Sequence, residues 1–298
     1  MLTVIQSALE NGLIYSLVAL ALYLSYTTLD IADMTTDGSF TLGCATAAAV
    51  CLLGHPILAL PAAMLAGAAA GGVTALLQTK LGVPSILAGI ITNFGLYSVN
   101  LTVMGGANVN LFRAPTIFKL VKETGIGWSK FVTLLPIVLL AAGLLVFFLG
   151  TRLGLSIRAT GDNRAMVRAS SINPAFTVTV GLCAANALTA LSGGLIVQYG
   201  NSGDMNLGVG MVVMGLASLI IGQTIFGRGS VVRDVAAVLG GSLIYRLIFA
   251  AALEFNVPAT YMKLLTAVIV AASIAAPSVR RGFALQRRKL AAGRKGGR

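Results

Sequence analysis

The sequence predicts an all-α, polytopic membrane protein on three observations. Hydrophobic residues make up 57% of the 298 residues and charged residues only 10%, a balance that water-soluble domains of this size do not show. The apolar residues fall into successive runs of about 17 to 25, each long enough to cross a bilayer as a helix. The ten-residue alternation typical of an outer-membrane β-barrel is missing. We therefore expect a bundle of transmembrane helices.

The predicted helices are the apolar runs between polar, glycine-containing or proline-containing segments. They cover 2–27, 38–54, 57–79, 84–104, 131–150, 174–199, 208–226, 232–251 and 260–278. We expect about nine crossings, or eight if one segment is re-entrant, within a range of about eight to ten. The first run has no basic leader region and is interrupted by Glu10, so we expect it to be retained as a helix. Gly67 and Gly71 have the spacing that lets membrane helices approach closely.

A single transmembrane domain is expected over 1–298, with a first half (1–150), a polar segment (151–173), a second half (174–278) and a basic tail (279–298). Lys and Arg accumulate on the cytoplasmic side of membrane proteins. Because a cytoplasmic C-terminus puts most of the 21 basic residues on that side, we expect N-out, C-in topology. The tail lacks interleaved aromatic residues, so we attribute the net charge of +12 to topology and anionic lipid, not to nucleic-acid binding. We expect the external segment 105–130 to lie at the lipid interface.

Two short segments, 32–43 and 203–211, share an Asp-Met pair among Gly, Thr and Ser residues. Five predicted helices separate them, which would give the two copies opposite orientations. Inverted repeats are a common way to build transporters, with discontinuous helices lining a pathway at the repeat interface. The competing interpretation is chance similarity.

Carboxylates are dense between the first two apolar runs. Asp37 or Ser39 is expected to cap the following helix, whose amides would then face a translocated anion or carboxylate. For Asp33, capping and a substrate contact fit equally well, and the simpler interpretation of this whole stretch is a solvated loop. Asp204 occupies the corresponding place in the second half.

A polar stripe lies within the fourth predicted helix, where Asn93, Tyr97 and Asn100 recur at i, i+4 and i+7 and so share one face. Asn186 and Gln198 place polar groups in the sixth. Any one of these residues is explained by bonds between helices, worth about 0.6 to 2 kcal/mol each. The whole set favours a polar pathway.

No catalytic or metal site is expected. The one histidine and three cysteines form no metal-ligand pattern, and the chain has no Gly-Lys pair from which to build a phosphate-binding loop. Motifs of serine hydrolases and zinc proteases are also missing. We therefore expect neither an enzyme nor a cofactor in this chain.

The polar, basic segment 151–173 stands between two strongly apolar stretches and is expected to dock a cytosolic partner. With this segment, the stretches 29–40, 158–164, 187–194 and 203–218 resemble the permease subunits of ABC importers in the branched-chain amino acid permease superfamily. The resemblance is strongest to tryptophan/tyrosine-type ABC transporter permeases and covers nearly the whole chain.

The resemblance implies a coupling helix within 161–173 that seats in a groove of the ATP-binding subunit. The residues that would serve it are Gly161 to begin a turn, Asp162 or Asn163 to cap a helix, Ala165, Met166 and Ala169 as a small apolar face, and Arg164 and Arg168 beside it. The competing interpretation is a surface loop held at the membrane by its arginines.

The resemblance also implies the partners. They are two ABC ATPase subunits that bind ATP and magnesium, a second permease copy in a homodimer, and an extracytoplasmic substrate-binding protein. The implied location is the bacterial cytoplasmic (inner) membrane, and the implied solute is small, an amino acid and possibly an aromatic one.

Two other functions fit the residues. A secondary transporter would couple transport to protons or sodium through Asp33, Asp37 and Asp204, because carboxylates within a membrane are functional by default. A membrane scaffold would assemble other subunits without transporting anything.

Overall fold

The computed structural model describes residues 2–122, residues 128–254 and short pieces between 261 and 272. The predicted ninth helix, 260–278, therefore lies largely outside the described residues, and the basic tail, 279–298, lies wholly outside them.

The described residues are mostly helical. In chain order the elements are α1 (Leu2–Leu22), the π-helical turn η1 (Tyr23–Thr28), α2 (Thr36–Leu52), α3 (Pro56–Thr79), α4 (Ser85–Met104), β1 (Asn108–Asn110), α5 (Ile117–Lys122), α6 (Ser129–Gly150), α7 (Arg152–Asp162), α8 (Arg164–Ala169), α9 (Pro174–Gly200), β2 (Ser202–Asp204), α10 (Met211–Phe226) and α11 (Val231–Glu254). The first eight predicted helices are confirmed to within a few residues. The antiparallel pair of β1 and β2 was not predicted.

Six described helical segments are long and apolar enough to cross a membrane. They are Val4–Thr28, Pro56–Thr79, Ser85–Met104, Ser129–Gly150, Pro174–Gly200 and Val231–Glu254. Helix α10 is apolar but shorter, and α2 has only 17 residues. The six spans account for most of the predicted crossings, while α2 and α10 are the candidates for segments that do not cross alone.

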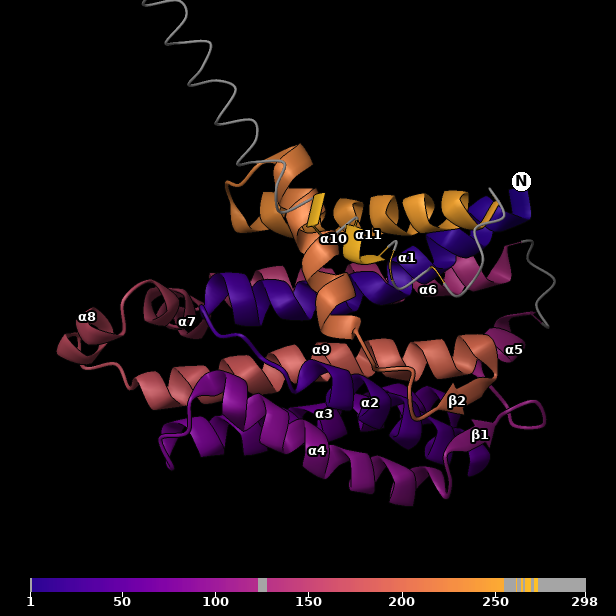
Figure 1. The fold of residues 1–298 in the computed structure, drawn as a ribbon, viewed down its shortest axis with the longest axis horizontal. Helices are drawn as coiled ribbons and strands as arrows, with labels where there is room; N and C mark the ends of the chain where they lie inside the picture. The colour runs from indigo at the N-terminus through magenta and orange to yellow at the C-terminus, as the bar shows by residue number, and fades with distance from the viewer. Residues whose placement is uncertain are drawn as a thin grey trace, which may run out of the picture.

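The long helices lie side by side along the long axis of the molecule (Figure 1). The N-terminus, α5 and the β1–β2 pair lie at one end, and α7 and α8 project from the other. Helices α1 and α9 run in opposite directions between these ends.

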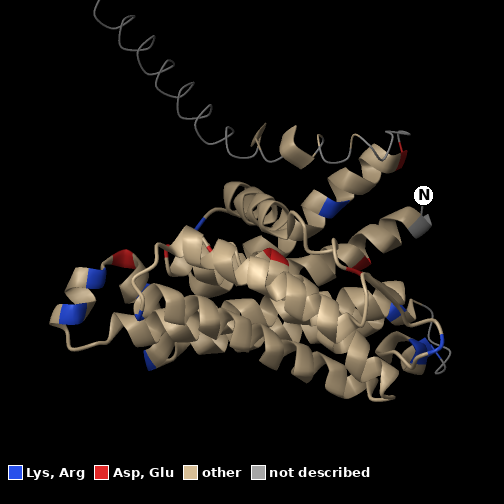
Figure 2. Cartoon of the chain, turned by 60° about the horizontal axis from the view of Figure 1, so that its bottom comes forward, with Lys and Arg blue, Asp and Glu red and all other residues tan. Residues whose placement is uncertain are grey.

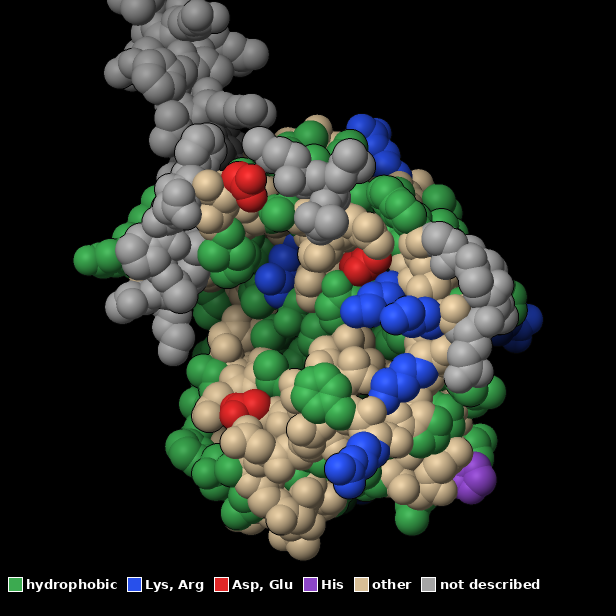
Figure 3. Space-filling model, turned by 90° about the vertical axis from the view of Figure 1, so that its right-hand side faces the viewer, with side chains coloured by type: hydrophobic (Ala, Val, Ile, Leu, Met, Phe, Trp, Pro, Cys, Tyr) green, Lys and Arg blue, Asp and Glu red, His purple; other side chains and the backbone are tan. Residues whose placement is uncertain are grey.

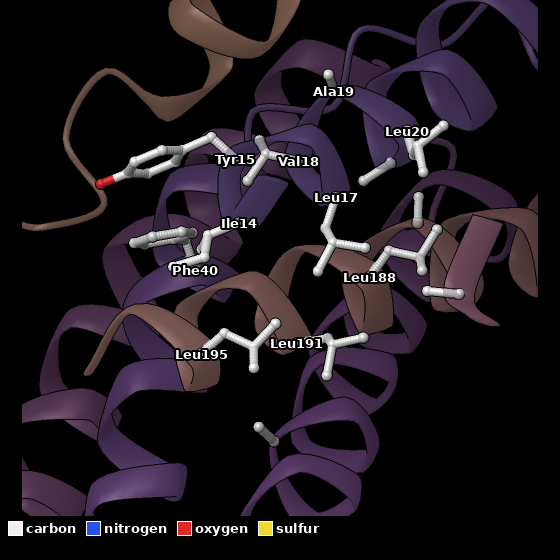
Figure 4. Close-up of a cluster of buried hydrophobic side chains, with 14 of the residues drawn as sticks. Ile14, Tyr15, Leu17, Val18, Ala19, Leu20, Phe40, Leu188, Leu191 and Leu195 are labelled. Carbon is white, nitrogen blue, oxygen red and sulfur yellow. The ribbon is translucent and has the colours of Figure 1, made fainter. Parts of the chain in front are cut away.

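The core is centred on α1 and α9, which bury leucines against each other (Figure 4). Tyr15 of α1 stacks on Phe40 of α2, with ring centroids 6.1 Å apart. Helix α3 approaches α9 at Gly67 and Gly71, where a Cβ would overlap the α9 backbone. The close packing predicted from the spacing of these two glycines is confirmed.

Two sets of helices make corresponding contacts. Helices α2 and α3 pack on each other and on α9, while α10 and α11 pack on each other and on α1. Helices α2 and α10, of 17 and 16 residues, both follow irregular backbone and begin near the middle of the molecule (Figure 1). An inverted repeat requires this correspondence.

Candidate functional site

A buried polar network surrounds the start of α2. The Asp33 carboxylate accepts bonds from the Thr35 amide at 2.9 Å and from Asn186 Nδ2 of α9 at 2.7 Å. Ser39 donates to Asn186 Oδ1 at 2.6 Å. All four residues are at most 2% exposed. Burying polar groups is costly unless they are bonded, so this network fixes the extended segment before α2 against α9.

Asp37 links the two halves of the chain. It lies in the first turn of α2, but its carboxylate accepts bonds from the amides of Gly210 at 3.0 Å and Val212 at 2.9 Å, at the start of α10. Helix α10 has no side-chain cap of its own. The expectation that Asp37 or Ser39 caps α2 is therefore wrong: Asp37 caps α10, and Ser39 bonds α9.

A cavity of about 460 Å³ opens beside this junction. It is lined by Asp37, Gly38, Thr41, Asn93, Phe94, Tyr97, Asn100, Met205, Asn206, Gly208 and Val209. Four of the sequence-predicted pathway residues, one on α2 and three on α4, thus share one cavity. Asn100 donates from Nδ2 to the carbonyl of Gly38 at 3.2 Å. Its buried Oδ1 has no hydrogen-bond partner within the described part of the chain.

Other predicted pathway residues lie elsewhere. Asp33, Ser39 and Asn186 form the adjacent network and do not line the cavity. Gln198 is fully buried near the end of α9, where Oε1 accepts from the Ile117 amide at 3.0 Å and Nε2 donates to the Pro56 carbonyl at 3.4 Å. Asp204 lies in β2 and accepts from the Asn206 amide at 2.6 Å. These bonds give Gln198 and Asp204 structural roles.

The prediction from sequence missed seven of the eleven residues that line the cavity. Thr41 lies one turn after Asp37 on the same face of α2, so the helical period alone points to it. The segment 205–209 follows Asp204 in the glycine-containing stretch that the sequence marked as unwound. No local pattern identified Phe94, which is 77% exposed beside Asn93.

Helix α8 forms an exposed tip. Asn163 caps it, because its Oδ1 accepts from the amides of Ala165 and Met166, both at 3.0 Å. Val167 is buried, whereas Ala165, Met166 and Ala169 are exposed. Basic residues gather at this tip and at the opposite end of the molecule, with few along the long helices (Figure 2).

Gly161 has a different place from the one expected. It lies inside α7 and does not begin a turn, and a Cβ there would overlap the carbonyl oxygen of Thr28 in η1. Gly161 therefore sets the packing of α7 on the helix bundle. The exposed surface begins at Asp162.

Comparison with known families gives the wider setting. Residues 4–273 match the family described as branched-chain amino acid transport system, permease component. The chain belongs to this permease family. It is a multi-pass membrane protein and the permease component of an ABC transporter, a class in which ATP hydrolysis lies in a separate subunit.

Several curated relatives cover most of this permease. A tyrosine transport system permease protein of Clostridioides difficile (strain R20291) is 37% identical over 270 residues, 90% of each chain. An uncharacterized protein of Rickettsia prowazekii (strain Madrid E) is 30% identical over 280 residues, 92% of this chain and 97% of its own. The ribose import permease protein of Escherichia coli (strain K12) is 26% identical over 221 residues, 72% of this chain and 67% of its own.

A solved structure shares the fold. It is described as an inward-facing conformation of a metal-chelate type ABC transporter, and it aligns with a TM-score of 0.53 at 15% identity over 94% of this permease and 85% of that chain. At this identity the likeness concerns the fold alone.

Proposed function

We propose that this chain is the membrane-spanning subunit of an ATP-driven importer and that the cavity between α2, α4 and the 205–209 segment is part of the solute pathway. The observation that carries the proposal is the meeting of two short helices at the cavity, with Asp37 of one capping the other. Transporters built from inverted repeats bind their solutes between discontinuous helices of this kind.

The proposed solute is a small molecule, an amino acid, with an aromatic one favoured. The cavity combines the exposed rings of Phe94 and Tyr97 with the amide groups of Asn93 and Asn100. The side-chain amides supply hydrogen-bonding groups for the α-ammonium and carboxylate groups, and a ring packs against the two aromatic side chains. The relative named for tyrosine transport supports the same class.

Two copies of the permease are proposed around one pathway, most simply as a homodimer. Phe94 is 77% exposed and Tyr97 57% exposed on the outer face of α4, which packs mainly on α2 and α3. A second copy placed against this face closes the cavity toward lipid. The assembly sits in the bacterial cytoplasmic (inner) membrane.

Helix α8 is proposed as the coupling helix. Its exposed Ala165, Met166 and Ala169 form a small apolar surface, and Arg164 and Arg168 flank it. The end of the molecule that carries α8 would face the cytosol and two ABC ATPase subunits, which bind ATP and magnesium. The end with the N-terminus would then face an extracytoplasmic substrate-binding protein, which fits N-out topology.

Uptake into liposomes tests this function. The permease is reconstituted with the ATPase that co-purifies with it, and labelled L-tyrosine and L-leucine are supplied with and without the binding protein. We expect accumulation only when ATP is present on the ATPase side. Gradient-driven uptake by the permease alone, with sodium or protons and no ATPase, would instead assign the chain to the ion-coupled transporters. If ATP drives neither amino acid, the proposed solute class is wrong.

A further inference from the structure

Arg246 is a charged residue inside a membrane-spanning helix. It lies on α11, eight residues or about 12 Å before the end of the helix at Glu254. Its guanidinium carbon is 3.8 Å from the centroid of the Tyr15 ring on α1 and 5.6 Å from that of Phe249. Aromatic faces attract a guanidinium group. They do not neutralise its charge.

The polar contacts of Arg246 are incomplete. Nη2 lies 3.4 Å from the sulfur of Met214, which is a weak acceptor. Nε is shielded from solvent and has no hydrogen-bond partner among the residues that the structure describes. Within 2–122 and 128–254, no carboxylate forms an ion pair with Arg246; the polar groups nearest its charge are the hydroxyls of Tyr15, which also bonds it, and of Tyr245. An unpaired charge within a membrane is costly and marks a functional site by default.

A cavity of about 400 Å³ lies against this arginine. Its described lining consists of Val4, Ser7, Ala8, Asn11, Arg246, Phe249, Ala250 and Leu253, so Arg246 is the one charged residue among the described residues that line it. The cavity shares no residue with the one beside Asp37. It lies between the N-terminal part of α1 and the C-terminal part of α11, toward the end of the molecule opposite α8 (Figure 1).

The surface at that end is favourable for anions. Figure 3 shows a hollowed face that carries several basic side chains, with acidic side chains among them. The basic residues in the adjoining segments include Arg113, Lys119 and Lys130. Where basic groups are in excess, the local concentration of anions rises.

We propose that Arg246 is the centre of an oxyanion-binding site that takes the carboxylate of a small, largely apolar acid. The planar donor fork of arginine matches a carboxylate, and Arg246 lines the cavity that the acid would occupy. The body of the acid packs against Phe249 and Leu253, with Ser7 and Asn11 at the rim. A lipid phosphodiester offers the same chemistry, but its headgroup would have to descend to the depth of Arg246.

Residue-specific modification tests the site in the wild-type chain. The full-length protein in phosphatidylcholine nanodiscs is treated with phenylglyoxal, and the modification rate of each arginine is followed by mass spectrometry. The probes are benzoate and its uncharged analogue benzamide. At a benzoate concentration about ten times its dissociation constant, we expect modification of Arg246 to slow about elevenfold by mass action. Benzamide should not slow it, and neither probe should slow Arg228, which bonds Gln223.

Each other outcome is informative. If phosphatidylglycerol nanodiscs slow Arg246 modification and benzoate does not, the oxyanion comes from lipid and the small-acid assignment is wrong. Equal rates under all conditions, or an Arg246 that never reacts, would overturn the site. As a second measurement, benzoate should raise the thermal unfolding midpoint of the wild type and of Arg228→Gln. Benzoate should leave the unfolding midpoint of Arg246→Gln unchanged. It should raise the midpoint of Arg246→Lys less than that of the wild type, because lysine keeps the charge but lacks the planar donor fork of arginine.

Discussion

The centre of this permease and the α8 tip use polar residues in opposite ways. At the centre, Asp33, Ser39 and Asn186 bond one another in the interior, between segments far apart in the sequence. At the tip, the bonds of Asn163 stay within its own short helix, and the surface residues remain exposed. Changes at the centre should therefore alter folding and transport together, whereas changes at the tip should alter only what docks there.

The largest effect is expected from Asn186→Leu, which tests the centre. Leucine has a similar size but leaves the Asp33 carboxylate and the Ser39 hydroxyl without their partner. The free energy of unfolding should fall by about 3 kcal/mol, because an unpaired buried charge is costlier than a lost bond. Thermal unfolding in detergent measures this. Thr179→Val is the matched control, since Thr179 bonds only its own helix. Equal losses in the two variants would contradict the special role of the network.

Asp37→Asn should have the next largest effect on stability and tests the link between the two halves of the chain. The amide retains one acceptor and loses the negative charge, so the cap on α10 weakens by about 1 to 2 kcal/mol. We expect faster hydrogen exchange at the amides of Gly210 and Val212, which bond this carboxylate. Asp204→Asn, which removes a charge within its own turn, should leave those two amides unchanged. Unaltered exchange in Asp37→Asn would show that α10 does not depend on α2.

These residues also show which features of the fold and the site could be predicted from the sequence. The bounds of the helices followed from apolar run length and from prolines at helix starts, such as Pro56 and Pro174, because both signals are local. The shared face of Asn93, Tyr97 and Asn100 followed from the helical period. The partner of Asp37 lies 173 residues away and is set by how α10 packs beside α2, which no local pattern encodes.

Gln198 shows that a polar residue in an apolar run can have distant bonding partners that the sequence does not reveal. A polar residue in an apolar run suggested a pathway, but the backbone of α5 and the start of α3 satisfy it. Gly161 was expected to begin a turn. It lies inside α7 instead, where the absence of a side chain lets α7 approach η1 closely. In both cases the deciding contact comes from a distant part of the chain.

Asn163→Ala tests the α8 tip and should have a smaller effect on stability than the two changes at the centre. Loss of the cap should destabilise α8 by about 1 kcal/mol. Because α8 has six residues and makes few contacts with the bundle, the global unfolding midpoint should hardly move. Hydrogen exchange within 164–169 should rise, and stimulation of the partner ATPase should fall in part. Asn163→Ser, which preserves a capping oxygen, should restore both. A large drop in the unfolding midpoint would mean that the tip is part of the folded core.

Met166→Glu should have the smallest effect on stability and decides the coupling role. Met166 is 55% exposed, so its replacement should change the free energy of unfolding by less than about 0.5 kcal/mol. It nevertheless places a negative charge in the small apolar surface beside Arg164 and Arg168, and a groove that receives this surface would have to bury that charge. ATPase stimulation in the reconstituted complex should therefore be lost while the permease stays folded. Leu53→Glu, an exposed apolar-to-acidic change outside α7 and α8, should retain stimulation. If Met166→Glu also retains ATPase stimulation, the exposed tip is not the docking surface. The few packing contacts of α8 would then reflect only its position at the edge of the membrane.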